Sequence, residues 1–148
     1  MTRINSAIPV KNLTDEHLLA EHREIKRLPY CMLKAKQSGS LYNIPSEFCL
    51  GKGHVLFFLN KMKFIYSRYN QLHDECICRG FNVLDYSDNF SNIEEAYFNN
   101  YIPTDLEKSL LETRISGRIT NSSKKFYHYN GNKITKEQAI LLLLSGSY

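Results

Sequence analysis

The sequence has 148 residues, of which 43% are hydrophobic and 23% are charged, and its formal net charge is +4. A chain of this length forms one domain and buries roughly two-thirds of the surface that its unfolded state exposes. No apolar run approaches the roughly 20 residues of a membrane span, and the N-terminus lacks the apolar core of a signal peptide. We therefore expect one compact cytoplasmic domain over residues 1–148, without a membrane segment.

The charges are distributed unevenly along the chain. Residues 83–107 include acidic side chains but no lysine or arginine, whereas residues 108–136 contain seven basic residues opposed only by Glu112. Arg23, Lys26 and Arg27 add a further basic group near the N-terminus. This distribution predicts one basic and one acidic surface. A basic surface favours a polyanion through counterion release, although ordinary solvated surface produces similar counts.

The first predicted helix begins after Thr14, which can cap it, and ends at Pro29. Asp15 and Glu16 in its first turn complement the helix dipole. At 100° per residue, the core-facing arc carries Leu18, Leu19, His22 and Ile25. The opposite arc carries Glu16, His17, Ala20, Arg23, Glu24 and Arg27. Glu21 lies off that polar arc, so a structural role suits it better than a chemical one.

A second, long helix is predicted from about residue 54 to residue 79, with Gly80 ending it. Its apolar stripe recurs at steps of three and four residues and comprises Val55, Phe58, Met62, Ile65, Tyr69, Leu72 and Cys76. A stripe of this kind is more often core than cofactor site, so this helix should be the central packing element. Gly51 and Gly53 before it indicate a tight turn that can contact phosphate, without the pattern of a nucleotide-binding loop.

A third helix is predicted from Thr104, where Thr104 and Glu107 match a capping box. We expect it to turn Leu106, Leu110, Leu111 and Ile115 inward. Thr135 and Gln138 match a second capping box, for a short apolar helix over residues 136–144. Long loops should fill residues 29–50 and 81–103, with a helical turn near residues 91–98.

These elements together predict an all-α fold. We expect a single compact domain of about three main helices with long loops and a short extra C-terminal helix. The four cysteines, Cys31, Cys49, Cys76 and Cys78, lack the paired spacing of a zinc site. We interpret them as free thiols and expect neither a metal nor a cofactor.

Several stretches, in the same order and at nearly constant spacing, resemble the phage pyrimidine-dimer DNA glycosylase (endonuclease V) family. They are Met1-Thr2-Arg3-Ile4-Asn5, His17-Leu18, Ala20-Glu21-His22-Arg23-Glu24, Gly53-His54-Val55-Leu56-Phe57-Phe58, Arg79-Gly80-Phe81-Asn82, Tyr101-Ile102-Pro103 and Phe126-Tyr127-His128-Tyr129-Asn130-Gly131. The resemblance covers roughly residues 1–133. It implies a metal-independent repair enzyme that acts as a monomer on damaged double-stranded DNA.

The resemblance also implies that Thr2 and Glu24 are catalytic. A small second residue normally allows the initiator methionine to be removed, which leaves the α-amine of Thr2 at the chain end. Such an amine has a pKa of about 7.7–8.0 against about 10.4 for lysine, so more of it is unprotonated near neutral pH. It can attack the anomeric carbon of a damaged nucleotide and form an imine, while Glu24 moves the protons.

The DNA-binding residues implied by the resemblance are mostly cations that clamp phosphates. Arginine is suited to this role because its guanidinium group binds phosphate oxygens bidentately. His17 can bond a phosphate or help to position the imine. The full set is Arg3, His17, Arg23, Arg27, Arg114, Arg118, Lys124, Lys125, Tyr127 and Tyr129. In residues 124–129, lysines alternate with aromatic rings that can stack on bases or pack over the minor groove.

The chain departs from the family pattern at several positions. Phe126 replaces a usual tryptophan, His128 replaces a more basic residue, and Glu16 replaces a usual glutamine and can repel DNA slightly. These differences leave two alternatives open. One is the same chemistry on another damaged or modified base, and the other is a DNA-binding module without catalysis.

Overall fold

The computed structural model describes residues 3–148, and Thr2 therefore lies outside the described residues. Six α-helices and one small hairpin form these residues, so the predicted all-α class is confirmed. The helices are α1 (Asp15–Ile25), α2 (Leu28–Ser38), α3 (His54–Phe58), α4 (Met62–Cys78), α5 (Asp105–Asn121) and α6 (Lys136–Ser145). The strands are β1 (Phe126–Tyr129) and β2 (Asn132–Thr135).

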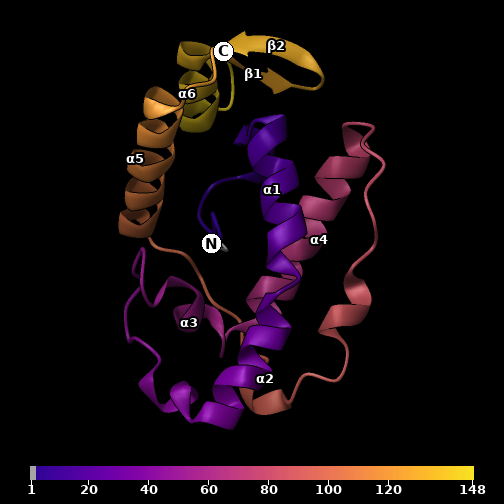
Figure 1. Cartoon of the computed structure of the whole chain (residues 1–148), viewed down its shortest axis with the longest axis vertical. Coiled ribbons are helices and arrows are strands. Elements are labelled where there is room, and N and C mark those ends of the chain that lie inside the picture. The colour runs from indigo at the N-terminus through magenta and orange to yellow at the C-terminus, as the bar shows by residue number, and fades with distance from the viewer. Residues whose placement is uncertain (1–2) are drawn as a thin grey trace.

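The helices α1 and α4 run side by side through the middle of the molecule (Figure 1). Helices α5 and α6 form a second layer beside them, the hairpin covers one end, and α2 and α3 lie at the other. Short 3-10 turns connect these elements, at Val10–Asn12, Ser40–Asn43, Ser87–Phe90 and Glu95–Tyr97. One continuous hydrophobic core joins the layers.

The N-terminal segment belongs to this core. Ile4 and Ile8 are both fully buried, at 0% exposure. Burial of two isoleucine side chains contributes on the order of 2 kcal/mol each, so the segment is held firmly to the domain. Arg3 is therefore connected directly to a fixed part of the backbone.

The predicted local signals at helix ends are confirmed in four places. Thr14 accepts a hydrogen bond from the backbone N–H of His17 and so caps α1. Thr135 and Gln138 form the reciprocal capping box of α6. Gly80 follows α4 with φ of +82°, in the left-handed region that favours glycine. Thr104 caps α5.

Two helical boundaries differ from the prediction. The long helix expected over residues 54–79 is two helices, interrupted at residues 59–61. At the break, Asn99 donates a hydrogen bond to the carbonyl of Asn60, and Lys61 Nζ donates to that of Phe57. Residues 29–38, expected within a loop, belong to α2. Pro29 lies in the first turn of this helix, where proline is favoured, and does not only end the previous helix.

Helix α5 also differs from its predicted packing. Leu111 and Ile115 are buried as expected, but Leu106 is 70% exposed and Leu110 is 40% exposed. The second half of the expected capping box is missing, because the Glu107 carboxylate instead accepts hydrogen bonds from Ser6 Oγ and Tyr101 Oη. Glu107 thus ties the N-terminal segment to α5.

The hairpin was not predicted, although its turn has a clear sequence signal. Asn130 and Gly131 connect the strands with φ of +51° and +80°, the combination that asparagine followed by glycine favours in a tight hairpin turn. Phe126 pairs with Thr135 and Tyr129 with Asn132. Asp15 accepts hydrogen bonds from the N–H groups of Asn130 and Gly131, which docks the hairpin on the start of α1.

Candidate active site

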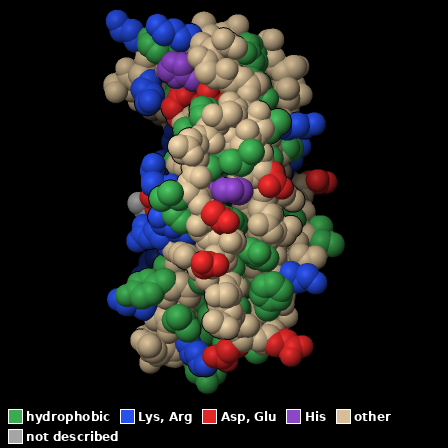
Figure 2. All heavy atoms as spheres, turned by 90° about the vertical axis from the view of Figure 1, so that its right-hand side faces the viewer, with side chains coloured by type: hydrophobic (Ala, Val, Ile, Leu, Met, Phe, Trp, Pro, Cys, Tyr) green, Lys and Arg blue, Asp and Glu red, His purple; other side chains and the backbone are tan. Residues whose placement is uncertain are grey.

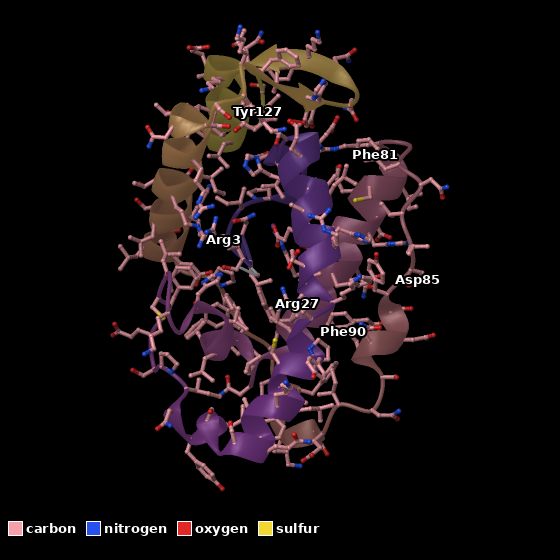
Figure 3. The ribbon with its side chains drawn as sticks, viewed as in Figure 1. Arg3, Arg27, Phe81, Asp85, Phe90 and Tyr127 are labelled. Atoms are coloured by element: carbon pink, nitrogen blue, oxygen red, sulfur yellow. The ribbon has the colours of Figure 1, made fainter. Side chains whose placement is uncertain are left out.

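A pocket of about 550 Å³ opens between α1, α5, the N-terminal segment and β1. Its size lies within the range of about 300–1,000 Å³ that is usual for ligand sites. Among the predicted site residues, six line it: Arg3, His17, Glu24, Arg114, Arg118 and Tyr127. Figure 3 shows Arg3 between α5 and α1, with Tyr127 toward the hairpin and Arg27 lower on α1.

Glu24 lies on the wall of the pocket that α1 provides. Arg27 donates a hydrogen bond to its carboxylate at 3.1 Å, and Arg23 Nε lies 3.7 Å from the other oxygen. The Glu24 side chain is 28% exposed and the two arginines are more than half exposed, so water reaches all three. The predicted grouping of Arg23, Glu24 and Arg27 on one polar arc is therefore confirmed.

His17 lies at the end of the pocket nearest the hairpin. Its Nδ1 is 2.7 Å from Thr14 Oγ1, and its ring stacks on that of Tyr127 with centroids 5.6 Å apart. Burial lowers the pKa of His17 to about 4, opposed by Glu21 and assisted by Lys124. The imidazole is thus neutral at pH 7. It can take part in hydrogen bonds there but does not supply a positive charge for a phosphate.

Arg114 and Arg118 reach the pocket from α5. Arg114 donates a hydrogen bond to Asn5 Oδ1 at 3.2 Å, while its buried Nε has no partner among the described residues. Burial lowers the pKa of the Arg114 guanidinium, and Glu21 opposes this effect. An arginine nonetheless stays charged at neutral pH. Arg118 is exposed. The pocket is thus lined by three arginines and two glutamates.

Glu21 forms the floor of the pocket and was rightly separated from the polar arc. It is 3% exposed, and Arg68 binds its carboxylate with two hydrogen bonds of 2.8 and 3.0 Å. Asn5 also donates to Glu21, at 3.0 Å. Asn5, Asn121 and Ser122 line the pocket but were not among the predicted site residues. Asn5 belongs to one of the stretches that resemble the glycosylase family, and nothing else in the sequence indicates that it lies in the site.

Besides Arg23 and Arg27, three described residues of the predicted set lie outside the pocket lining, namely Lys124, Lys125 and Tyr129. Lys124 and Lys125 are exposed, and Lys124 Nζ lies 5.8 Å from the ring of Tyr127 at the pocket rim. Tyr129 faces away, since its hydroxyl donates to the carbonyl of Lys11 and its ring contacts Arg79. Tyr127 lines the pocket but is only 4% exposed.

Glu16, suspected of repelling DNA, is occupied within the protein. Its carboxylate accepts hydrogen bonds from the backbone N–H of His128 at 2.9 and 3.1 Å and contacts His128 Nδ1 at 3.3 Å. Glu16 thus helps Asp15 to dock the hairpin, and it holds Tyr127 against His17. In this chain the acidic residue secures the top of the pocket.

The space-filling view supports an uneven surface charge. Lys and Arg side chains gather along one edge of the molecule, whereas acidic side chains lie on the face toward the viewer (Figure 2). No helix among residues 3–148 combines the length and the hydrophobicity that crossing a bilayer requires. The same residues contain no cluster of three or more His, Cys, Asp or Glu side chains arranged to hold a metal ion.

The fold and this pocket define a mostly helical protein in which several cations surround a solvent-accessible carboxylate. A family model described as pyrimidine dimer DNA glycosylase matches residues 1–87, which is more than half of the chain. The chain belongs to this family of DNA repair enzymes. The matched residues include Arg3, His17, Arg23, Glu24 and Arg27. The contributions of α5 and the hairpin lie beyond them and rest on the geometry of the pocket.

Proposed function

We propose that this protein removes the damaged base from cyclobutane pyrimidine dimers in double-stranded DNA and then cleaves the strand at the abasic site. The observation that carries the proposal is the pocket that is lined by both Arg3, the neighbour of Thr2 in the chain, and Glu24, together with Arg114 and Arg118. Membership of the glycosylase family supports the substrate class.

The proposed nucleophile is the α-amine of Thr2, exposed once the initiator methionine has been removed. Its lone pair attacks C1′ of the damaged nucleotide, and the bond from C1′ to the base breaks. The base leaves with that electron pair and takes up a proton. The nitrogen then loses a proton, and its lone pair forms the C1′=N bond as the C1′–O4′ bond breaks. O4′ leaves with the bonding pair and takes up a proton, so that a protonated imine joins the protein to the sugar.

Strand cleavage follows from the imine by β-elimination. A base removes a proton from C2′, the C3′–O bond breaks, and the 3′ phosphate leaves with the electron pair. Water then hydrolyses the imine and frees the amine. Glu24 is the proposed proton carrier in these steps, because it is a water-accessible carboxylate on the pocket wall.

The proposed DNA contacts divide into two groups. Arg3, Arg23 and Arg27 bind phosphates around the damaged nucleotide, and His17 donates or accepts a hydrogen bond as a neutral ring. Arg114, Arg118, Lys124 and Lys125 bind the flanking backbone. We assign Tyr127 and Tyr129 to holding the hairpin in place, since their contacts are with His17, Lys11 and Arg79. The enzyme needs the damaged nucleotide out of the stack to reach C1′.

The direct test is nicking of supercoiled plasmid before and after ultraviolet irradiation, together with cleavage of a duplex that carries one abasic site. Cleavage of irradiated and abasic DNA supports the proposal. Cleavage of the abasic duplex alone favours another base as substrate. Binding without cleavage of either favours a DNA-binding module. Sodium borohydride should trap the imine, and peptide mapping should locate the adduct on residue 2. An adduct on Lys124 or Lys125 contradicts the amine mechanism.

A further inference from the structure

His54 holds the backbone directly next to Arg3. The N–H of Ile4 donates a hydrogen bond of 3.0 Å to His54 Nε2. Other bonds hold the segment further on, where Asn5 donates to Glu21 and Arg68 donates to the carbonyl of Ile8. Of these three hydrogen bonds, the one between Ile4 and His54 lies nearest to the N-terminus.

The partners of His54 determine where its proton lies. A backbone N–H can only donate, so Nε2 must carry the lone pair toward Ile4. Nδ1 then carries the proton and donates to the carbonyl of Cys49 at 3.0 Å. The ring is thus a neutral imidazole in one tautomer. If it were protonated, an N–H at Nε2 would face the N–H of Ile4.

The surroundings of His54 fix the ring in this orientation. It is 2% exposed, and the rings of Phe48 and Phe58 pack edge-on against it at centroid distances of 5.5 and 5.4 Å. The net effect of these surroundings is a lowered pKa of His54, chiefly because of burial. Arg114 on α5 lowers it further, whereas the hydrogen bonds with Cys49 and Ile4 and the charge of Glu21 on α1 act in the opposite direction. The environment thus favours the neutral form that accepts from Ile4.

We propose that His54 is a positioning residue for the chemistry at the N-terminus, acting by anchoring Ile4 beside Arg3, which lines the pocket. This inference rests on the proposed function, since it presumes that the chain end reacts. A reacting group must be held within a narrow range of positions, and displacement by about 1 Å can slow a reaction on the order of 100-fold. Loss of the anchor therefore slows imine formation more than it weakens DNA binding.

Replacing His54 by glutamine or by asparagine separates its hydrogen bond to Ile4 from its other contacts. In His54→Gln the longer side chain places its oxygen near the position of Nε2 and keeps an acceptor for Ile4. In His54→Asn the shorter side chain keeps a donor for Cys49 but loses that acceptor. Both variants are neutral and lack the imidazole ring. The control is His22→Asn, because His22 is also a buried histidine but bonds to His73 and does not line the pocket.

The experiment measures borohydride trapping on an abasic duplex under single-turnover conditions, at saturating protein and below the melting temperature of every variant. DNA affinity comes from a parallel binding titration, and hydrogen exchange reports the Ile4 amide. We expect His54→Asn to trap about 10- to 100-fold more slowly, with DNA affinity within about threefold and faster exchange at Ile4. His54→Gln and His22→Asn should trap within about threefold of the wild type.

Two results would overturn the inference. One is a folded His54→Asn protein that traps at the wild-type rate, and the other is a His54→Gln protein as slow as His54→Asn. Failure of the proposed function has a different signature, since the wild-type protein would then give no adduct at residue 2. The wild-type reaction therefore tests the chemistry, and the comparison between the two amides tests the anchor.

Discussion

Glu21 and Glu24 lie one turn apart on α1, line the same pocket and contact arginines, yet their surroundings differ. The Glu21 side chain is 1% exposed and is bound twice by Arg68, which is 4% exposed. Glu24 is 28% exposed and contacts the exposed side chains of Arg23 and Arg27. The floor of the pocket thus holds a buried, or closed, ion pair between Glu21 and Arg68. The wall holds an exposed, or open, one between Glu24 and its two neighbouring arginines.

The difference suggests two roles for the same chemical pair. A buried carboxylate whose oxygens are occupied costs several kcal/mol to uncouple, so it holds a structure and cannot readily exchange protons. An exposed pair contributes only about 0–1 kcal/mol to stability, so its carboxylate can change partners when a substrate arrives. If Glu24 has the proposed catalytic role, variants of the two glutamates should affect activity and stability separately.

The largest effect is expected for Glu24→Gln. Glutamine keeps the size and hydrogen-bonding reach of glutamate but cannot exchange a proton at neutral pH. Cleavage of irradiated and abasic duplexes should fall by on the order of 10²–10⁴-fold, because this is the usual contribution of a general acid or base. Filter binding should show DNA affinity within a few-fold of the wild type. A folded Glu24→Gln protein that cleaves within a few-fold of the wild type would exclude this carboxylate as the proton carrier.

The reverse pattern is expected for Glu21→Gln. The substitution leaves the buried Arg68 without a carboxylate partner, and breaking such a pair costs about 3–5 kcal/mol of stability. Urea unfolding should reveal this loss, while cleavage by the folded protein stays within a few-fold of the wild type. Arg27→Met is the matched control on the open pair and should change stability by less than about 1 kcal/mol. If Glu21→Gln and Arg27→Met destabilised the protein equally, the buried and the exposed ion pair would not differ in their contribution to stability.

This distinction was partly predictable from the sequence. Thr14, Gly80 and Thr135 set helix ends through bonds that span only a few residues, so their roles are readable from local pattern. The helical wheel likewise separates Glu24 from Glu21 on the sequence alone. The Asn130-Gly131 turn carried a signal of the same local kind, and the hairpin was predictable from it.

Other features depend on distant parts of the chain. The interruption between α3 and α4 involves Asn99, which donates to Asn60 from a loop far along the sequence. The contact of Arg114 with Asn5 joins residues 109 positions apart, so no spacing rule indicates it. The apolar stripe from Val55 to Cys76 continues across this interruption, so the sequence pattern predicts one uninterrupted helix. Leu106 and Leu110 matched an inward-facing pattern, but the structure leaves this side of α5 exposed.

Helix α1 also carries two histidines with lowered pKa values, which make stability depend on pH. Burial chiefly lowers the pKa of both His17 and His22 to about 4 in the folded protein, below the ordinary value of 6.5. Between these values the unfolded chain binds more protons, so stability is fully present above about pH 6.5 and is lost as pH falls toward 4. The loss attributable to the buried His22 is on the order of 2 kcal/mol.

Thermal unfolding as a function of pH measures this effect. The wild-type melting temperature should fall by several degrees between about pH 6.5 and 4, and His22→Phe should reduce the slope because it removes one titrating group. His73→Phe is a useful companion, since His73 contributes to the lowered pKa of His22. A melting temperature that is flat over this range in the wild type would contradict the neutral, buried state of both rings.

The smallest effect is expected at the exposed cations around the open wall. Binding to undamaged duplex should be weak and strongly salt-dependent, because it rests on contacts between cations and phosphates. Arg118→Ala and Lys125→Ala should each weaken binding on all sequences alike and flatten the salt slope by roughly one unit or less. Lys63→Ala, on α4 and outside the pocket lining, is the matched control and should leave the slope unchanged. A slope that responds to Lys63 and not to Arg118 or Lys125 would place the DNA on another face of the protein.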